Sequence, residues 1–109
     1  MFASQGTIAS NAEKNSGYAS PITNIVTGIG DISGASVVLR LNASQAASNA
    51  ASQGTGNYGN YPLYIGRRGG TSLPYNGRLY SLVVCGKLAS AAEITATEAW
   101  VNQKTRAFA

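Results

Sequence analysis

This chain of 109 residues has no histidine, a single cysteine and only four acidic residues. The lack of histidine excludes Ser-His-Asp and Cys-His catalysis, and it excludes histidine-ligated metal sites. The cysteine, Cys85, has no partner within the chain for a disulfide. Because it lies in the apolar run 82–85, we expect it to be a buried small hydrophobic residue rather than a reactive thiol.

Long apolar runs are also lacking. No run approaches the roughly 20 residues of a membrane-spanning helix, and the N-terminus has no basic-then-apolar leader. We therefore expect no membrane span and no signal peptide in this chain. Export would then depend on a longer parent chain or on cell lysis.

Charged residues make up only 11% of the chain, about half of the usual share. The net charge is +4, and the whole excess falls after residue 66, where an acidic partner is one interpretation. No basic run exceeds two residues, so we favour solubilising charge. The RGG-like element at 67–70 is a single copy, and we predict no nucleic-acid partner.

The four acidic residues do not form a catalytic pair. Glu13 lies in a polar segment, and Asp31 lies in a predicted loop. Glu93 and Glu98 share a predicted helix, whereas glycoside hydrolases need two carboxylates at a fixed separation across the sugar. We therefore predict no enzymatic activity and no cofactor. Asp31 is a calcium candidate, but it brings a single carboxylate to a cation that takes about six to eight oxygen ligands.

What the chain does contain is typical of a β-rich, loop-rich protein. Apolar residues make up 44% of it, many of them alanine, and there are 13 glycines besides many serine, threonine and asparagine residues. The length fits one domain over 1–109. Disorder is the competing interpretation, and the apolar runs between residues 63 and 84 argue against it there.

Several segments have the pattern of strands. The strongest is 36–42, in which Val37, Leu39 and Leu41 fall on one face. A strand is also predicted at 22–28, followed by a glycine-rich loop at 28–34, and a turn at 42–43 leads to a weak strand at 45–51. Residues 1–21 are small and polar, and we expect them to be poorly structured or to form an edge strand.

The last third of the chain has the most apolar pattern. We predict a short strand at 63–65, a loop at 66–77 and a central strand at 78–85 that is apolar on both faces. Ser90 and Glu93 form a capping box that predicts a helix from Ala91. The helix is apolar on two sides, so we expect it to be wedged between other elements. The predicted core is Leu63, Ile65, Leu79, Leu82, Val83, Val84, Cys85 and Trp100.

This ending resembles the C-terminal half of a laminin-G or concanavalin-A-like jelly roll, in the form found at the ends of phage and prophage tail proteins. The matching motifs are Ile65-Gly66, Tyr75-Asn76-Gly77, the apolar run 79–85 and the capping box at 90–93. The run 39–43 is similar to a family strand that ends in an Asn-Gly hairpin, with Ala43 in place of glycine. The resemblance covers roughly residues 30–109.

The resemblance implies an all-β, antiparallel jelly-roll sandwich with one short C-terminal helix. A jelly roll has about eight strands, and five or six are recognisable here. The chain is therefore expected to be part of a longer tail protein, or a half-domain that completes its sandwich against another copy as a homo-oligomer. The implied function is that of a non-enzymatic virion module. It would bind a surface glycan or receptor, or assemble a tail, in a virion or extracellular location.

Two other functions stay open from the sequence: a secreted bacterial lectin or adhesin, and a degenerate glycoside-hydrolase jelly roll. Aromatic rings with nearby amide and guanidinium donors are typical of carbohydrate sites, because rings stack on sugars while donors reach hydroxyl groups. Tyrosines that merely cover sheet faces are the alternative. The candidate ligand-binding residues are Asn57, Tyr58, Asn60, Tyr61, Arg67, Arg68 and Tyr75.

Overall fold

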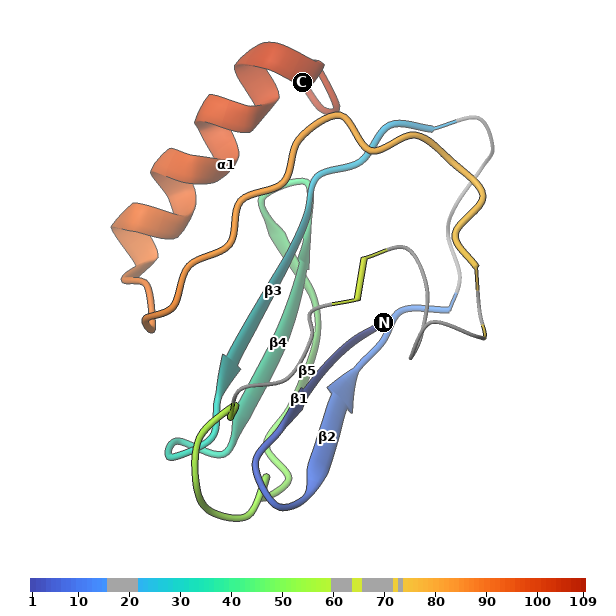
Figure 1. Cartoon of the computed structure of the whole chain (residues 1–109). Coiled ribbons are helices and arrows are strands. Elements are labelled where there is room, and N and C mark those ends of the chain that lie inside the picture. The colour runs from blue at the N-terminus through green and yellow to red at the C-terminus, as the bar shows by residue number, and fades with distance from the viewer. Residues whose placement is uncertain (16–21, 60–63, 66–71, 73) are drawn as a thin grey trace.

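A computed structural model describes residues 1–15, 22–59, 64–65, 72 and 74–109 (Figure 1). Within these ranges the protein is small and mostly β, with two antiparallel sheets and one C-terminal helix. The two-stranded sheet pairs β1 (Phe2–Gln5) with β2 (Ala9–Ala12). The three-stranded sheet has the order β3 (Val26–Asp31), β4 (Ser36–Leu41) and β5 (Ser44–Asn49), and the helix is α1 (Ala91–Thr105).

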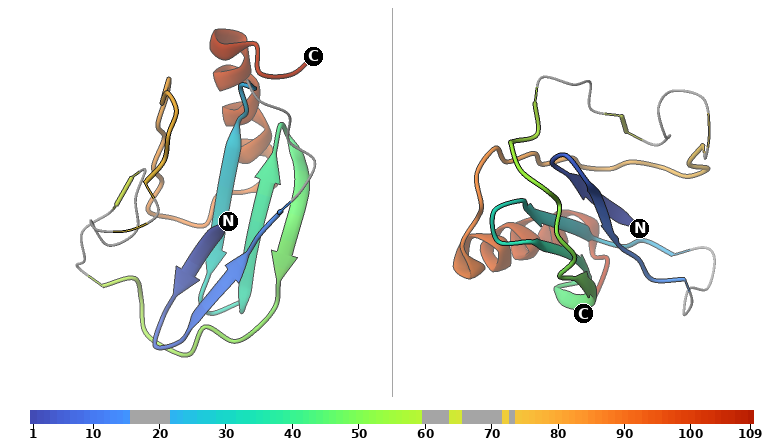
Figure 2. Two further views of the ribbon diagram at one scale, coloured as in Figure 1. Left: turned by 90° about the vertical axis from the view of Figure 1, so that its right-hand side faces the viewer. Right: turned by 90° about the horizontal axis from the view of Figure 1, so that it is seen from below.

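The elements form three layers. The β1–β2 sheet packs on one face of the three-stranded sheet, and α1 lies on the opposite side (Figure 2, right). The alternation of β4 explains this arrangement. Val37 and Leu39 point to the β1–β2 sheet and are buried, whereas Arg40 points to the helix. The predicted strand at 36–42 and the apolar face of Val37 and Leu39 are confirmed.

Alternating glycines bring the two sheets close together. A side chain at Gly28 would overlap the ring of Phe2, and one at Gly30 would overlap the hydroxyls of Ser4 and Tyr58. Both glycines therefore belong to β3, which continues to Asp31, and the turn follows at 32–35. The predicted loop at 28–34 is wrong for 28–31, where the glycines serve the close approach of another strand, and it is confirmed for 32–34, which lie in the turn.

The hairpin between β4 and β5 is a two-residue turn. Asn42 and Ala43 both have positive φ, at 50° and 65°, which is the type I′ geometry that suits the twist of paired strands. The Asn42 side chain fixes the turn, because its Oδ1 accepts a 2.9 Å hydrogen bond from the backbone N–H of Ile25. The predicted turn at 42–43 and the return strand after it are confirmed.

The N-terminal segment forms strands. Of the two alternatives for residues 1–21, the described part has a paired hairpin at 2–12, tied to the later chain by backbone hydrogen bonds from Gly6 and Ile8 to the carbonyl of Gln53. Its inward positions are Phe2, which packs against the core cluster, and the small residues Ser4, Ser10 and Ala12, which are buried. Three of these four inward side chains are small, which lets the β1–β2 sheet lie close to the three-stranded sheet.

The predicted core is wrong. The core cluster consists of Ala12, Val37 and Leu39, with Phe2 and Ala47 packed against it. The predicted members are instead exposed: Ile65 at 50%, Leu79 at 60%, Leu82 at 53%, Val83 at 54%, Val84 at 66% and Trp100 at 48%, with Cys85 exposed as well. Leu63 lies outside the described residues. The physical reason is that no described strand pairs with 78–85, so this segment is not a central strand.

Candidate binding surface

The candidate carbohydrate residues lie on two separate segments. Asn57 and Tyr58 belong to the loop after β5, and Tyr75 belongs to the extended chain that precedes α1. No hydrogen bond joins these two segments within the described residues. Asn60, Tyr61, Arg67 and Arg68 fall outside the described residues. The described contacts do not join Tyr75 to Asn57 or Tyr58, and the carbohydrate site stays a prediction.

Two of these side chains have structural contacts. The Tyr58 hydroxyl hydrogen-bonds the Ser4 hydroxyl at 2.9 Å and lies over Gly30, so it ties the loop to β1 and β3. The Asn57 Oδ1 accepts a 2.9 Å hydrogen bond from the backbone N–H of Gly59 and so closes a local turn. Tyr75, in contrast, is 63% exposed. Of the three, Tyr75 presents the freest ring.

Asp31 holds a turn. Its Oδ1 accepts hydrogen bonds from the Ser33 hydroxyl at 2.8 Å and from the Gly34 backbone N–H at 2.9 Å. These bonds, the one from Gly34 foremost, lower the pKa of Asp31 from its usual value. In the described ranges no three residues of the histidine, cysteine, aspartate or glutamate types come together as a metal site. The role that the contacts give Asp31 is to shape the hairpin between β3 and β4.

The most distinctive surface is the apolar segment, which we define as residues 79–85, Leu-Tyr-Ser-Leu-Val-Val-Cys. The extended chain 74–86 that contains it makes no hydrogen bond or ion pair within the described part of the protein. It stands apart from both sheets in Figure 2 (left). Its exposed large residues are Tyr75, Leu79, Tyr80, Leu82, Val83 and Val84, and Leu88 follows them. Exposed apolar residues on this scale are typical of a surface that contacts another molecule.

The total accessible surface gives a measure of this exposure. The chain exposes 7873 Å² at a mass of 11.2 kDa, whereas a folded monomer of that mass exposes about 5,700 Å². The excess is roughly 2,200 Å². Exposed apolar side chains of the described residues, Leu79, Tyr80, Leu82, Val83 and Val84 among them, contribute to this excess.

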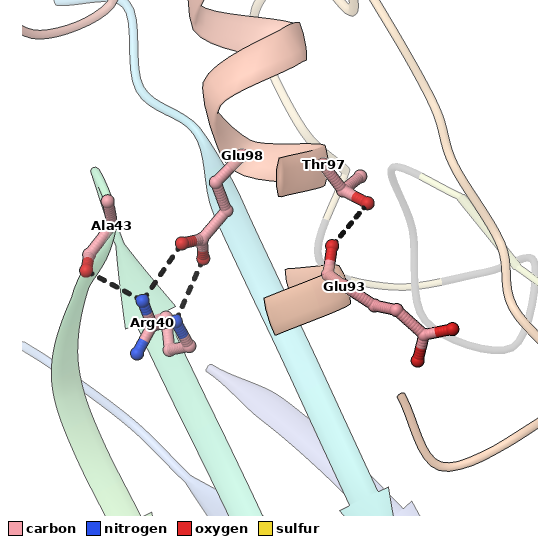
Figure 3. A network of polar contacts seen from close by, with 5 residues as sticks. All are labelled: Arg40, Ala43, Glu93, Thr97 and Glu98. Carbon is pink, nitrogen blue, oxygen red and sulfur yellow. Dashed lines mark hydrogen bonds and ion pairs between the residues drawn. The ribbon is translucent and has the colours of Figure 1, made fainter. Parts of the chain in front are cut away.

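A polar anchor joins α1 to the three-stranded sheet. The Arg40 guanidinium donates to both carboxylate oxygens of Glu98, each at 2.9 Å, and donates to the carbonyl of Ala43 at 2.7 Å (Figure 3). The Glu98 side chain is only 3% exposed and that of Arg40 is 22% exposed. Two parallel hydrogen bonds between opposite charges form one of the strongest polar contacts in proteins. Sequence reasoning missed this pair, for which the one signal is an arginine within the strongest strand pattern.

The anchor shifts the ionisation of both partners. The hydrogen bonds from Arg40 lower the pKa of Glu98, against the opposing effect of burial. The same bonds raise the pKa of Arg40. Both groups are therefore charged at neutral pH, and the helix is held to the sheet by an ion pair at its one buried position, Glu98.

The predicted start of the helix is confirmed. The Ser90 side chain accepts from the backbone N–H of Glu93, and the Glu93 carboxylate accepts from the backbone N–H of Ser90. Glu93 also pairs with Lys87 at 2.6 Å, and these contacts, the one from Lys87 foremost, lower its pKa to about 2. The expectation of a helix wedged between other elements is wrong, because Trp100 is half exposed with Lys104 4.0 Å above its ring.

No described helix has the length and apolar character needed to cross a membrane. Comparisons with protein families, with curated proteins and with solved structures find no match to this chain.

Proposed function

We propose that this protein is a non-enzymatic structural module of a phage or prophage particle, and that its task is to associate with other chains. The observation that carries the proposal is the exposed apolar segment, together with an accessible surface roughly 2,200 Å² larger than that of a compact monomer. An assembly module folds its own small core and leaves the remaining apolar surface for its neighbours.

The proposed architecture is an incomplete jelly-roll sandwich of the laminin-G or concanavalin-A-like type. The two packed antiparallel sheets and the capped C-terminal helix support it. The segment 78–85 would be the strand that pairs only in the assembly. Paired there, it would gain backbone hydrogen bonds that it does not make with the described residues of its own chain.

The contacts of the acidic residues support a role without catalysis. Asp31 holds a turn, Glu93 caps the helix and pairs with Lys87, and Glu98 is paired with Arg40. Each of these carboxylates therefore has a structural partner that keeps it charged. A general acid needs a raised pKa, and the pKa of each of these three carboxyl groups is lowered.

Binding of a surface carbohydrate, as in a lectin or receptor-binding tip, is the second candidate. The exposed ring of Tyr75 favours it, since a sugar stacks on a free aromatic face. Tyr75→Ala would then abolish binding on a glycan array, whereas Tyr58→Phe, which removes only the hydroxyl bonded to Ser4, would leave binding intact.

Particle composition tests the main proposal. Particles purified from an induced lysate of the strain that carries the gene are expected to contain this chain in a fixed ratio to a major capsid or tail protein, as measured by quantitative mass spectrometry. Presence of the chain in the soluble fraction alone would refute the proposal. Turnover of a polysaccharide panel by the purified protein would refute its non-enzymatic part.

A further inference from the structure

We propose that the apolar segment pairs with the same segment of a second copy, as an antiparallel two-stranded ladder on a two-fold axis. This inference rests on the proposed function and specifies its partner. The surface is residues 79–85, and the partner is another molecule of this chain. In the ladder, a segment that pairs with no described strand of its own chain becomes a strand.

The backbone of the segment is prepared for such pairing. Residues 74–86 make no hydrogen bond within the described part of the chain, and they run as an elongated trace outside any helix or strand (Figure 1). Leucine, tyrosine and valine supply most of the segment, and β-branched and aromatic residues favour strands. An exposed, extended and apolar segment is the kind that adds to another strand through its free N–H and C=O groups.

The sequence of the segment is complementary to itself. A two-fold axis in an antiparallel ladder must pass through a residue pair, because neighbouring pairs alternate between hydrogen-bonded and non-hydrogen-bonded types. With Leu82 on the axis, Leu82 faces Leu82 of the second copy, and every other residue of 79–85 faces a residue from the same range of that copy. Leu79 then faces Cys85 of the second copy, Tyr80 faces Val84, and Ser81 faces Val83.

The flanking charges permit this register. Arg78 lies opposite Gly86 of the second copy, and Lys87 lies opposite Gly77. In this register no two cations face each other directly. Facing cations would destabilise the ladder, because like charges directly opposite each other repel. The glycines give each long basic side chain room to reach solvent.

The chain as a whole exposes more surface than a stable dimer needs to bury. A standard interface buries about 800 Å² on each partner. The roughly 2,200 Å² by which the accessible surface exceeds that of a compact monomer is more than twice this area. The core of Ala12, Val37 and Leu39 is small for a free domain, so burial between copies would add the apolar contact that a single chain lacks.

Measurement of the mass in solution tests whether the partner is a second copy of the chain. Sedimentation equilibrium of the purified chain is expected to give twice the 11.2 kDa mass of one chain. Leu82→Lys and Leu82→Glu each place like charges opposite each other on the axis, and each is expected to weaken the dimer at least about tenfold. A mixture of the two variants is expected to form the dimer again, because lysine then faces glutamate.

The matched control is Ile8→Lys, because Ile8 is 54% exposed, close to the 53% of Leu82, but lies in the turn between β1 and β2. It is expected to leave the dimer unchanged. Circular dichroism separates loss of the dimer from loss of the fold, since Leu82 contributes nothing to the core cluster and its variants are expected to keep the spectrum of the parent.

Cysteine cross-linking tests the register. In a Cys85→Ser background, Leu82→Cys is expected to form a disulfide-linked dimer under mild oxidation, because the two thiols face each other. Val84→Cys in the same background is the control, since its two copies would lie four positions apart along the ladder, about 14 Å, beyond the reach of a disulfide. The natural Cys85 would lie about 20 Å from its copy and is expected not to cross-link.

The outcomes separate this inference from the proposed function. A stable monomer at about 100 µM, a dimer that resists Leu82→Lys, or cross-linking at position 84 but not at 82 would each overturn the ladder. Such a result together with the chain in purified particles would leave the assembly role standing with another partner. A dimer that behaves as expected together with absence from particles would instead refute the virion role alone.

Discussion

Glu98→Gln is expected to loosen the attachment of α1 to the sheet. The substitution keeps the size of the side chain and one oxygen that accepts from Arg40, but it removes the charge and one of the two 2.9 Å hydrogen bonds. Arg40 keeps its bond to the carbonyl of Ala43, so its charge is only partly uncompensated. The loss is therefore smaller than removal of the whole carboxylate would cause.

The magnitude follows from the burial of the pair. A hydrogen bond to a charged group contributes about 1.5–3 kcal/mol, and removal of one partner from a fully buried ion pair costs about 3–5 kcal/mol. Glu98 is nearly fully buried, but Arg40 is 22% exposed, so water screens part of the interaction. We expect Glu98→Gln to lower the free energy of unfolding by about 2 kcal/mol.

Urea denaturation at a fixed protein concentration measures this loss. Far-UV circular dichroism follows the helix, and the fluorescence of Trp100, the one tryptophan of the chain, reports on the same helix. Lys87→Gln is the control, because it breaks an ion pair whose side chains are 65% and 48% exposed, and it is expected to leave the midpoint unchanged. The double variant Arg40→Leu with Glu98→Leu is expected to recover much of the loss.

A free energy of unfolding for Glu98→Gln within about 0.5 kcal/mol of the parent would refute the reasoning. It would mean that the contact shown in Figure 3 is not what holds α1 to the sheet.

Three further predictions follow from local geometry. Arg40 lowers the pKa of Glu98 in the folded state, so the stabilisation of the fold by this ion pair should be complete above the unfolded pKa of about 4.5 and be lost as pH falls through the lower folded pKa. Urea midpoints from pH 7 to 3 measure this loss, and Glu98→Gln should flatten that part of the profile. Gly28→Val should lower the free energy of unfolding, measured by urea denaturation, by about 2 kcal/mol or more because it displaces Phe2. Gly86→Ala, which has open space around it, should leave that free energy unchanged, and equal midpoints for the two variants would contradict the packing of β1 on β3. Ala43→Gly should raise the thermal midpoint, by up to about 1 kcal/mol in stability, because its φ of 65° is unfavourable for alanine, and a lowered midpoint would argue against a type I′ turn.

Local patterns in the sequence identified the elements whose formation depends on near neighbours. The alternation in 36–41 fixed which face of β4 is buried, because side chains alternate across any strand. Ser90 and Glu93 determined where α1 begins, since the capping box involves only backbone and side chains within three residues. The turn at Asn42 and Ala43 is local in the same sense.

Tertiary structure decided what depends on distant partners. Gly28 and Gly30 have the composition of a loop, and only the arrival of Phe2 and Ser4 from β1 makes them part of a packed strand. The pairing of Arg40 with Glu98 joins residues 58 positions apart, which no short-range pattern encodes. The segment 78–85 has the most strand-like sequence of the chain, yet it is exposed and pairs with no strand among the described residues. A strand exists only when another backbone accepts its hydrogen bonds, and the sequence of one chain determines the capacity to pair but not the presence of a partner.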